Sequence, residues 1–226
     1  MTDKKLKPED LVLQATDHYY KSEFKEAIKS LDKAIELKPD FAEAWYNKAI
    51  TYSVMGHVQD EIDSYDKAIE INPDYAEAWS NKASALGRAG RLEEALQCTE
   101  KAIELKPLFQ VAWCNKGASL SSLERELEAL AAYDKAIEIQ EDYLEAWFNK
   151  AVSLHNLDKP EGALKAYNRA LELHPNYPEA YYNRAGLYVK LKDLEKAKSD
   201  LEKAIMLDSS YKEQALTDES LKTLIS

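Results

Sequence analysis

One phrase recurs in this chain at a fixed interval of 34 residues, and no other feature constrains the fold as strongly. The phrase reads Lys/Arg-Ala, then Ile/Leu, one further residue and Ile/Leu, and it occurs over 33–37, 67–71, 101–105, 135–139, 169–173 and 203–207. A second phrase, built around an aromatic residue and an Asn, follows the first five blocks over 41–49, 75–83, 109–117, 143–151 and 177–185. A fixed period in this range is typical of a solenoid, in which each unit buries its apolar face by stacking on its neighbours. The period predicts a surface for binding, because nothing in the repeat supplies chemistry.

The repeats fill nearly all of the 226 residues. They predict a single array over 8–211, with units 8–41, 42–75, 76–109, 110–143, 144–177 and 178–211. Residues 1–7 then form an N-terminal tail, and residues 212–226 form a C-terminal capping segment. No room is left in this sequence for a separate catalytic domain.

Composition narrows the class of partner. The formal net charge is −11 and the sequence pI is near 5.0, so the chain repels phosphate backbones and anionic lipid head groups. We therefore expect no nucleic-acid and no membrane partner. The N-terminus lacks the apolar core of a secretory signal, no apolar run is long enough to span a bilayer, and Cys98 and Cys114 have no metal or redox spacing. These observations predict a cytoplasmic protein.

Each unit is predicted to be a helix, a tight turn and an antiparallel helix. In the second unit, apolar and small residues fall three or four positions apart before Gly56 and again after it, which is the stripe of a helix. Gly56 is placed to form a left-handed helix end, and Pro73 stops the second helix. Alanines recur midway along the first helices and along the second helices, so that two backbones can approach, and a large aromatic residue fills the space beside them. The fold class is therefore all-α.

The combined pattern resembles the tetratricopeptide repeat family: an aromatic residue, then a small residue, then two alanines and a proline, at a period of 34. The resemblance implies a right-handed superhelix in which first helices line a concave groove and second helices form the convex side. It also implies a C-terminal solvating helix. Leu221, Leu224 and Ile225 form a short apolar stripe for it, with Asp218 as its expected N-cap.

An asparagine stands two residues after each large aromatic of units two to six: Asn47, Asn81, Asn115, Asn149 and Asn183. An amide donates and accepts hydrogen bonds, so it can pair with the backbone of an extended peptide whatever the peptide's side chains. The resemblance implies the same role, since grooves lined by such asparagines grip extended polypeptide in this family. The alternative is that each Asn bonds only a neighbouring helix.

The residue before each Asn varies between units: Tyr46, Ser80, Cys114, Phe148 and Tyr182. If these side chains face the groove, they supply pockets for the ligand. The alternative is ordinary packing between helices.

Charge favours a neutral or basic ligand, because Glu9, Glu43, Glu77, Glu145 and Glu179 begin the first helices. A solvated face is the alternative explanation of these glutamates. One subgroup of the family clamps acidic chaperone C-termini with Lys and Asn. The matching places here hold Val12, Thr16, Asn47, Glu77 and Asn81, of which only Asn47 matches, so an acidic chaperone C-terminus is not expected.

Glu61 stands where the other units have a second-helix alanine. Either its carboxylate reaches water near the helix N-terminus, or it marks a looser joint or a bound polar group. The second explanation predicts that Glu61→Ala raises stability.

No enzyme is predicted. The four histidines lie in different units without metal spacing, and the sequence contains neither a phosphate-binding glycine loop nor a nucleophile elbow. We expect no catalytic residue, no metal and no cofactor. The sequence predicts an adaptor whose concave groove binds an extended peptide or protein segment, as a monomer or weak homo-oligomer. The alternative is a structural scaffold that associates with itself through its terminal repeats.

Overall fold

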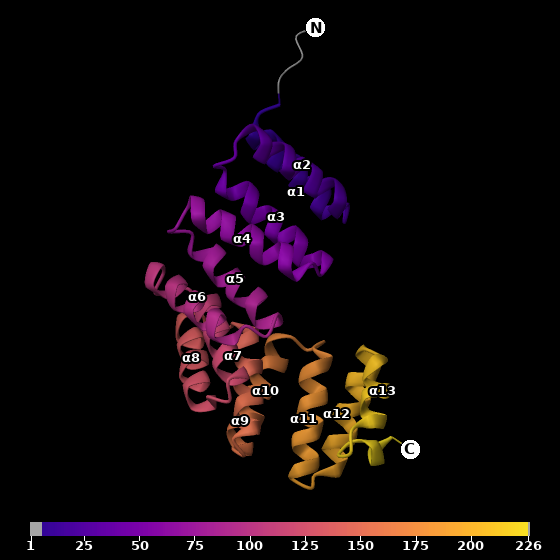
Figure 1. Ribbon diagram of the computed structural model, residues 1–226. Helices are drawn as coiled ribbons and strands as arrows, with labels where there is room; N and C mark the ends of the chain where they lie inside the picture. The colour runs from indigo at the N-terminus through magenta and orange to yellow at the C-terminus, as the bar shows by residue number, and fades with distance from the viewer. Residues whose placement is uncertain (1–5, 226) are drawn as a thin grey trace. The chain divides into compact units, whose positions relative to one another are not determined.

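The computed structural model describes residues 6–225, and its regular secondary structure there is helical throughout (Figure 1). Residues 1–5 of the expected tail lie outside the described residues. The first helices of the six repeats are α1 (Pro8–Tyr20), α3 (Ala42–Met55), α5 (Ala76–Arg88), α7 (Gln110–Ser122), α9 (Leu144–Asn156) and α11 (Pro178–Lys190). The second helices are α2 (Phe24–Leu37), α4 (Val58–Ile71), α6 (Leu92–Leu105), α8 (Glu126–Ile139), α10 (Pro160–Leu173) and α12 (Leu194–Leu207). A shorter helix, α13 (Ser210–Thr217), and a 3-10 turn, η1 (Lys222–Leu224), follow. The all-α repeat fold expected from the sequence is confirmed.

The described chain divides into two compact units, and the boundary between them in the sequence falls within α7, after Ser119. In the first unit α1 to α6 pack in chain order, and in the second unit α8 to α12 do the same. The packed pairs within one repeat are α1 with α2, α3 with α4, α5 with α6, α9 with α10 and α11 with α12, and α3, α5, α9 and α11 also pack on the second helix of the repeat before them. The expectation that 8–211 form one continuous array stays a prediction.

Every hairpin turns through one left-handed residue, always at the same repeat position. Gly56 and Gly90 have φ of 73° and 74°, as glycine readily adopts. The other four turns place a residue with a side chain there: Ser22, Glu124, Asp158 and Lys192, with φ between 56° and 62°. The left-handed end expected at Gly56 is confirmed, and the fourth repeat keeps the same turn without its glycine.

Small residues form the centre of each hairpin. Ala27, Ala49, Ala95, Ala163 and Ala185 are completely buried, as the close approach of two helices requires. The large aromatic beside them is only half-buried, however. Its polar edge bonds the carbonyl oxygen six residues earlier, as in Trp79 Nε1 to Pro73 at 2.9 Å and Trp147 Nε1 to Glu141 at 2.8 Å. Because this bond reaches a backbone atom, the missing proline at position 141 leaves it intact.

A cation three residues after the aromatic joins each repeat to the one before it. Lys48 pairs with Asp32 at 2.7 Å, and the same contact recurs as Lys82–Asp66, Lys116–Glu100 and Lys150–Asp134. Each ammonium group also lies 5.1 to 5.8 Å from the centre of its Trp ring. Such a cation–π contact adds to the ion pair. The ion pair crosses the joint between successive repeats, whereas the ring lies on the lysine's own helix.

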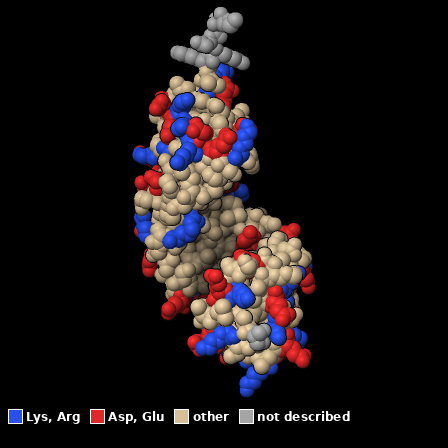
Figure 2. Space-filling view, turned by 90° about the vertical axis from the view of Figure 1, so that its right-hand side faces the viewer, with Lys and Arg blue, Asp and Glu red and all other residues tan. Residues whose placement is uncertain are grey.

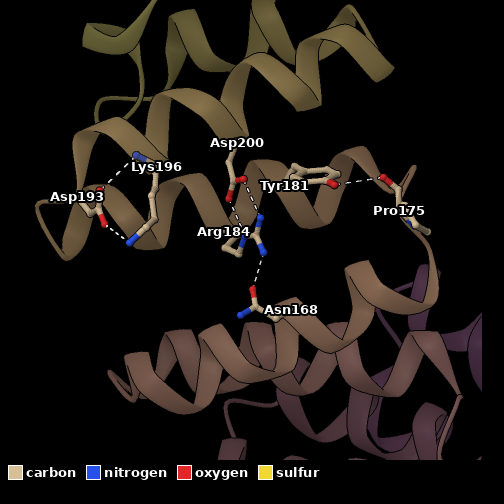
Figure 3. A network of polar contacts seen from close by, with 7 residues as sticks. All are labelled: Asn168, Pro175, Tyr181, Arg184, Asp193, Lys196 and Asp200. Carbon is tan, nitrogen blue, oxygen red and sulfur yellow. Dashed lines mark hydrogen bonds and ion pairs between the residues drawn. The ribbon is translucent and has the colours of Figure 1, made fainter.

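The last joint departs from this rule, because position 168 holds Asn instead of an acid. Arg184 therefore donates to Asp200 of its own repeat, from Nε at 2.6 Å and Nη2 at 2.8 Å, and to Asn168 Oδ1 at 2.5 Å (Figure 3). Asp200 is 7% exposed. The network thus ties α10, α11 and α12 together through one guanidinium group.

The C-terminal segment corrects one expectation. Asp218 is the C-cap of α13, not the N-cap of a second helix, and its carboxylate accepts hydrogen bonds from the backbone and hydroxyl of Ser220 at 2.8 and 2.6 Å. This turn reverses the chain, so residues after it form only the short η1 turn. Leu221 is 1% exposed and packs with Ala185 and Leu201, with Leu224 and Ile225 beside them.

Candidate peptide-binding surface

Two adjoining hollows lie along the first helices of the first unit. The Asn47 hollow, about 150 Å³, is lined by Thr16, Tyr19 and Tyr20 of α1 and by Asn47, Ile50 and Thr51 of α3, above Ala15 and Leu31. The Asn81 hollow, about 300 Å³, is lined by Tyr19, Ile50, Ser53, Val54, Glu61, Tyr65, Asn81, Ser84 and Arg88. Tyr19 and Ile50 line both hollows, so the two adjoin each other between α1 and α5, and together they are called the asparagine-lined depression.

The helices place these side chains on one face by simple periodicity. Asn47 and Ile50 are three residues apart on α3, and Asn81, Ser84 and Arg88 follow the same spacing on α5. Residues three or four apart share a face of a helix. The asparagines were expected from the sequence, but their companions Tyr19 and Ile50 were not. The spacing of three from Asn47 is a readable signal for Ile50, whereas α1 has no asparagine from which Tyr19 could be found.

The asparagines differ in how far the fold already uses them. Asn81 Nδ2 donates to the Tyr46 hydroxyl at 3.0 Å, and Asn115 Nδ2 donates to the carbonyl and hydroxyl of Ser80 at 3.0 and 3.1 Å. Both contacts cross to the preceding repeat, as the alternative explanation of the ladder expected. Within residues 6–225 the structure shows no such cross-repeat bond for the Asn47 amide, which lines its hollow.

The variable positions lie mainly in the interior. Ser80, Cys114 and Phe148 are 0%, 3% and 6% exposed, so they pack between helices and offer no open pocket to a ligand. Tyr46 and Tyr182 are half-buried. Tyr46 stacks on Tyr75 at 4.7 Å between ring centres. Helix packing, one of the two explanations offered for this set, therefore describes its three buried members.

Tyr182 is held by the C-terminal segment. Its hydroxyl donates to Asp218 Oδ2 at 3.2 Å, and its ring lies 5.0 Å from that of Tyr211. Burial, together with the nearby negative charge of Asp218, raises the pKa of Tyr182 to about 12. Asn149 and Asn183 are half-buried on α9 and α11, so the second unit contributes the remaining two asparagines.

Glu61 is buried, which corrects the expectation that its carboxylate reaches water. It is 2% exposed and accepts a hydrogen bond from Arg88 Nη2 at 2.5 Å. Arg88 also donates to the hydroxyls of Ser84 and Ser53, and its side chain stays 44% exposed. The group bound at this site is thus the chain's own guanidinium, and the floor of the Asn81 hollow carries a neutralised pair.

Other chemistry is not assembled in the described part of the chain. No three potential metal ligands among His, Cys, Asp and Glu come together there. None of the helices described is both long and apolar enough to cross a membrane. Over the visible face in Figure 2, acidic and basic side chains are intermixed.

A stack of helical hairpins with such a depression defines a class of interaction modules, and comparison with known proteins agrees. Tetratricopeptide repeat models match residues 42–75, 111–143, 144–177 and 178–211, and further models of the same repeat match 17–56 and 64–97. The chain belongs to the tetratricopeptide repeat family.

Solved structures share the fold. The Cut9 and Hcn1 hetero-tetramer of the APC/C aligns with 97% of this chain at a TM-score of 0.86 and 15% identity, and this chain spans 43% of that one. PilF of Pseudomonas aeruginosa aligns over 93% of this chain and 97% of its own, with a TM-score of 0.78 and 18% identity. YrrB, described as a TPR protein with an unusual peptide-binding site, is 27% identical at a TM-score of 0.59, over 83% of this chain and 98% of its own. No curated protein sequence matches the chain.

Proposed function

We propose that this protein is a non-enzymatic adaptor that binds an extended peptide or protein segment along its first helices. One observation carries the proposal: the Asn47 and Asn81 hollows share Tyr19 and Ile50, and their lining comes mainly from the first helices of three successive repeats. An extended chain can follow such a depression while amide groups pair with its backbone. The peptide-binding site named for YrrB adds support by analogy.

The lining favours a neutral or basic segment. The Asn81 hollow contains Glu61 and Arg88, whose charges offset each other. Glu77 at the start of α5 is paired with Lys106 at 2.9 Å, which holds the pKa of its carboxyl below the usual value through a hydrogen bond from that lysine. Glu43 at the start of α3 lies outside the lining of both hollows; it is exposed and available for a cation on a ligand that extends beyond them.

Asn47 gives the sharpest test. Asn81→Ala and Asn115→Ala remove hydrogen bonds between repeats, so a loss of affinity in these variants could come from a disturbed fold as well as from a lost ligand contact. We would select peptides from a random display library with the wild-type protein, and then compare Asn47→Ala with Gln59→Ala, which removes an exposed amide from α4 outside both hollows. Loss of at least fivefold in affinity for Asn47→Ala, with unchanged melting temperature and unchanged binding by Gln59→Ala, is the expected result. Full retention of affinity by Asn47→Ala contradicts the proposal.

Self-association through the terminal repeats is the second candidate. Leu13 of α1 is 69% exposed at the N-terminal end of the first unit. At the other end Leu221 is buried by its own chain, which removes one surface for stacking. Light scattering over a wide concentration range distinguishes the two: a constant monomer mass argues against this candidate, and a dimer that Leu13→Glu dissociates supports it.

A further inference from the structure

Two crevices of similar size lie at equivalent places in the second and fifth repeats. The second-repeat crevice, about 430 Å³, lies between α3 and α4 beside Trp45. The fifth-repeat crevice, about 510 Å³, lies between α9 and α10 beside Trp147. Neither is lined by the asparagines, so both belong to a surface apart from the proposed peptide site.

The fifth-repeat crevice has an apolar floor and a fixed aromatic wall. Leu154, Gly162 and Ala166 line the floor. A side chain at Gly162 would place its Cβ 3.3 Å from Leu154 Cδ1, so the absence of a side chain there leaves room for the leucine. The indole of Trp147 is held by its hydrogen bond to the Glu141 carbonyl. A bound apolar side chain would meet a preformed surface.

Charge separates the two crevices. The second repeat carries three acids along α4 at this place, Asp60, Asp63 and Asp66, while the fifth repeat carries Gly162, Lys165 and Asn168 at the same positions. Every other repeat in the sequence keeps at least one acid among these three positions. Each replacement removes a negative charge, and Lys165 adds a positive one.

Three cations line the fifth-repeat crevice: Lys150, Lys165 and Arg169. Lys150 pairs with Asp134, and Arg169 pairs with Glu172 at 3.1 Å; Glu172 and Glu141 are the two acids that also line the crevice. The acids of both pairs are well exposed, and such pairs rearrange at little cost. Lys165 is exposed and has no ion-pair partner within residues 6–225, so its charge is open to a ligand.

We propose that the fifth-repeat crevice is a second docking site, which takes an acidic peptide segment with a large apolar side chain. The apolar side chain rests on Leu154 against Trp147, both of which are partly exposed. Flanking carboxylates pair with Lys165 and Arg169, the latter through the two parallel hydrogen bonds that a guanidinium offers. The partner is thus opposite in charge to the ligand proposed for the asparagine-lined depression, and one chain would join two different segments.

The test uses a defined probe, the acetylated peptide Asp-Glu-Leu-Phe-Glu-Asp, and its amide analogue Asn-Gln-Leu-Phe-Gln-Asn. Binding to the full chain is measured by calorimetry at low and high salt. Lys165→Asp gives the fifth repeat the acid that the second repeat carries at the same position, Asp63. Lys29→Asp is the matched control, because Lys29 occupies the equivalent position of the first repeat and changes the net charge by the same amount.

We expect the acidic probe to bind, the amide analogue to bind at least tenfold more weakly, and high salt to abolish the difference because ions screen exposed charges. Lys165→Asp should lower the affinity for the acidic probe at least tenfold, and Lys29→Asp should lower it less than twofold. Equal losses in the two variants, equal binding of the two peptides, or no binding of the acidic probe overturns the proposal. So does loss of the acidic probe in Asn47→Ala, which would place it in the asparagine-lined depression instead.

Discussion

Removing the carboxylate of Asp200 is the perturbation whose effect on stability follows most directly from the structure. Asp200 accepts two of the hydrogen bonds that Arg184 donates, and both side chains are nearly buried, 10% and 16% exposed (Figure 3). Burial opposes the charged form of Arg184, but the hydrogen bonds and charge of Asp200 outweigh it and raise the pKa of the guanidinium. The variant Asp200→Ala therefore leaves a buried cation without its counter-charge.

Breaking a buried ion pair on one side costs about 3–5 kcal/mol. Arg184 keeps a hydrogen bond to Asn168 and lies over the rings of Tyr181 and Tyr188, at 5.5 and 5.8 Å. These contacts place the expected loss at the lower end, about 3 kcal/mol. Urea denaturation followed by circular dichroism measures it. Glu202→Ala, an exposed acid on the same helix, serves as the control and should change stability by less than about 0.5 kcal/mol.

The other repeats suggest a rescue. Positions equivalent to Asn168 hold Asp32, Asp66, Glu100 and Asp134, each paired with the next repeat's lysine. Adding Asn168→Asp to Asp200→Ala gives Arg184 an acid at the usual place, and we expect it to restore about half of the lost free energy. The reasoning is refuted if Asp200→Ala costs no more than Glu202→Ala, or if the second substitution restores nothing.

Three further predictions follow from single positions. Arg88→Ala should destabilise the fold by about 3 kcal/mol because Glu61 stays buried without its partner. Glu61→Ala should leave the melting temperature unchanged or higher because the half-exposed Arg88 can turn to water. Equal losses of stability in the two variants would contradict this explanation. Lys192→Gly should raise the free energy of unfolding by about 1 kcal/mol in urea denaturation, because it removes the strain of a left-handed residue with φ of 62°. Gly56→Ala should lower the free energy of unfolding by a similar amount. An unchanged free energy of unfolding in Lys192→Gly argues against strain at that residue. Burial acts to raise the pKa of Asp218, but hydrogen bonds from Ser220 and Tyr182 hold it below its usual value. The stabilisation from Asp218 is then present above the ordinary pKa of an aspartate, about 3.9, and is lost as the pH falls through the lowered value. Asp218→Asn should accordingly lower the melting temperature at pH 7 and not at the acid end of the range, and a difference independent of pH would count against it.

The hairpins could be predicted because period and turn chemistry agree. Helical spacing, Gly56 and Pro73 place the ends of α3 and α4 close to where the structure has them. Glu124 stands where Gly56 and Gly90 form the turns of their repeats, yet its turn is the same as the others. Packing of the two flanking helices holds the residue in the left-handed conformation. The preference of glycine for that conformation, read from the sequence alone, does not account for this packing.

The candidate site was harder to predict, because the sequence does not say which side of a helix a variable residue faces. Phe148 follows Trp147 directly, yet Phe148 is buried and Trp147 is half-exposed. Neighbouring residues on a helix point about 100° apart, so one can face the interior while the next faces the surface. The ion pairs between repeats were missed for another reason: Lys82 and Asp66 lie 16 residues apart, far beyond the spacings of one helix, although their recurrence in four joints is visible in the sequence.

The short α13 has a consequence for the C-terminal end of the repeats. Tyr211 occupies the repeat position of Tyr75 and Tyr177, and its ring meets Tyr182 at 5.0 Å much as Tyr177 meets Phe148 at 4.9 Å. The ring of Tyr211 in α13 therefore packs on the sixth repeat as the first helix of a seventh repeat would. A duplicated 34-residue segment inserted after residue 211 would find a matching surface on both sides, so the array can lengthen by whole units while its terminus stays the same.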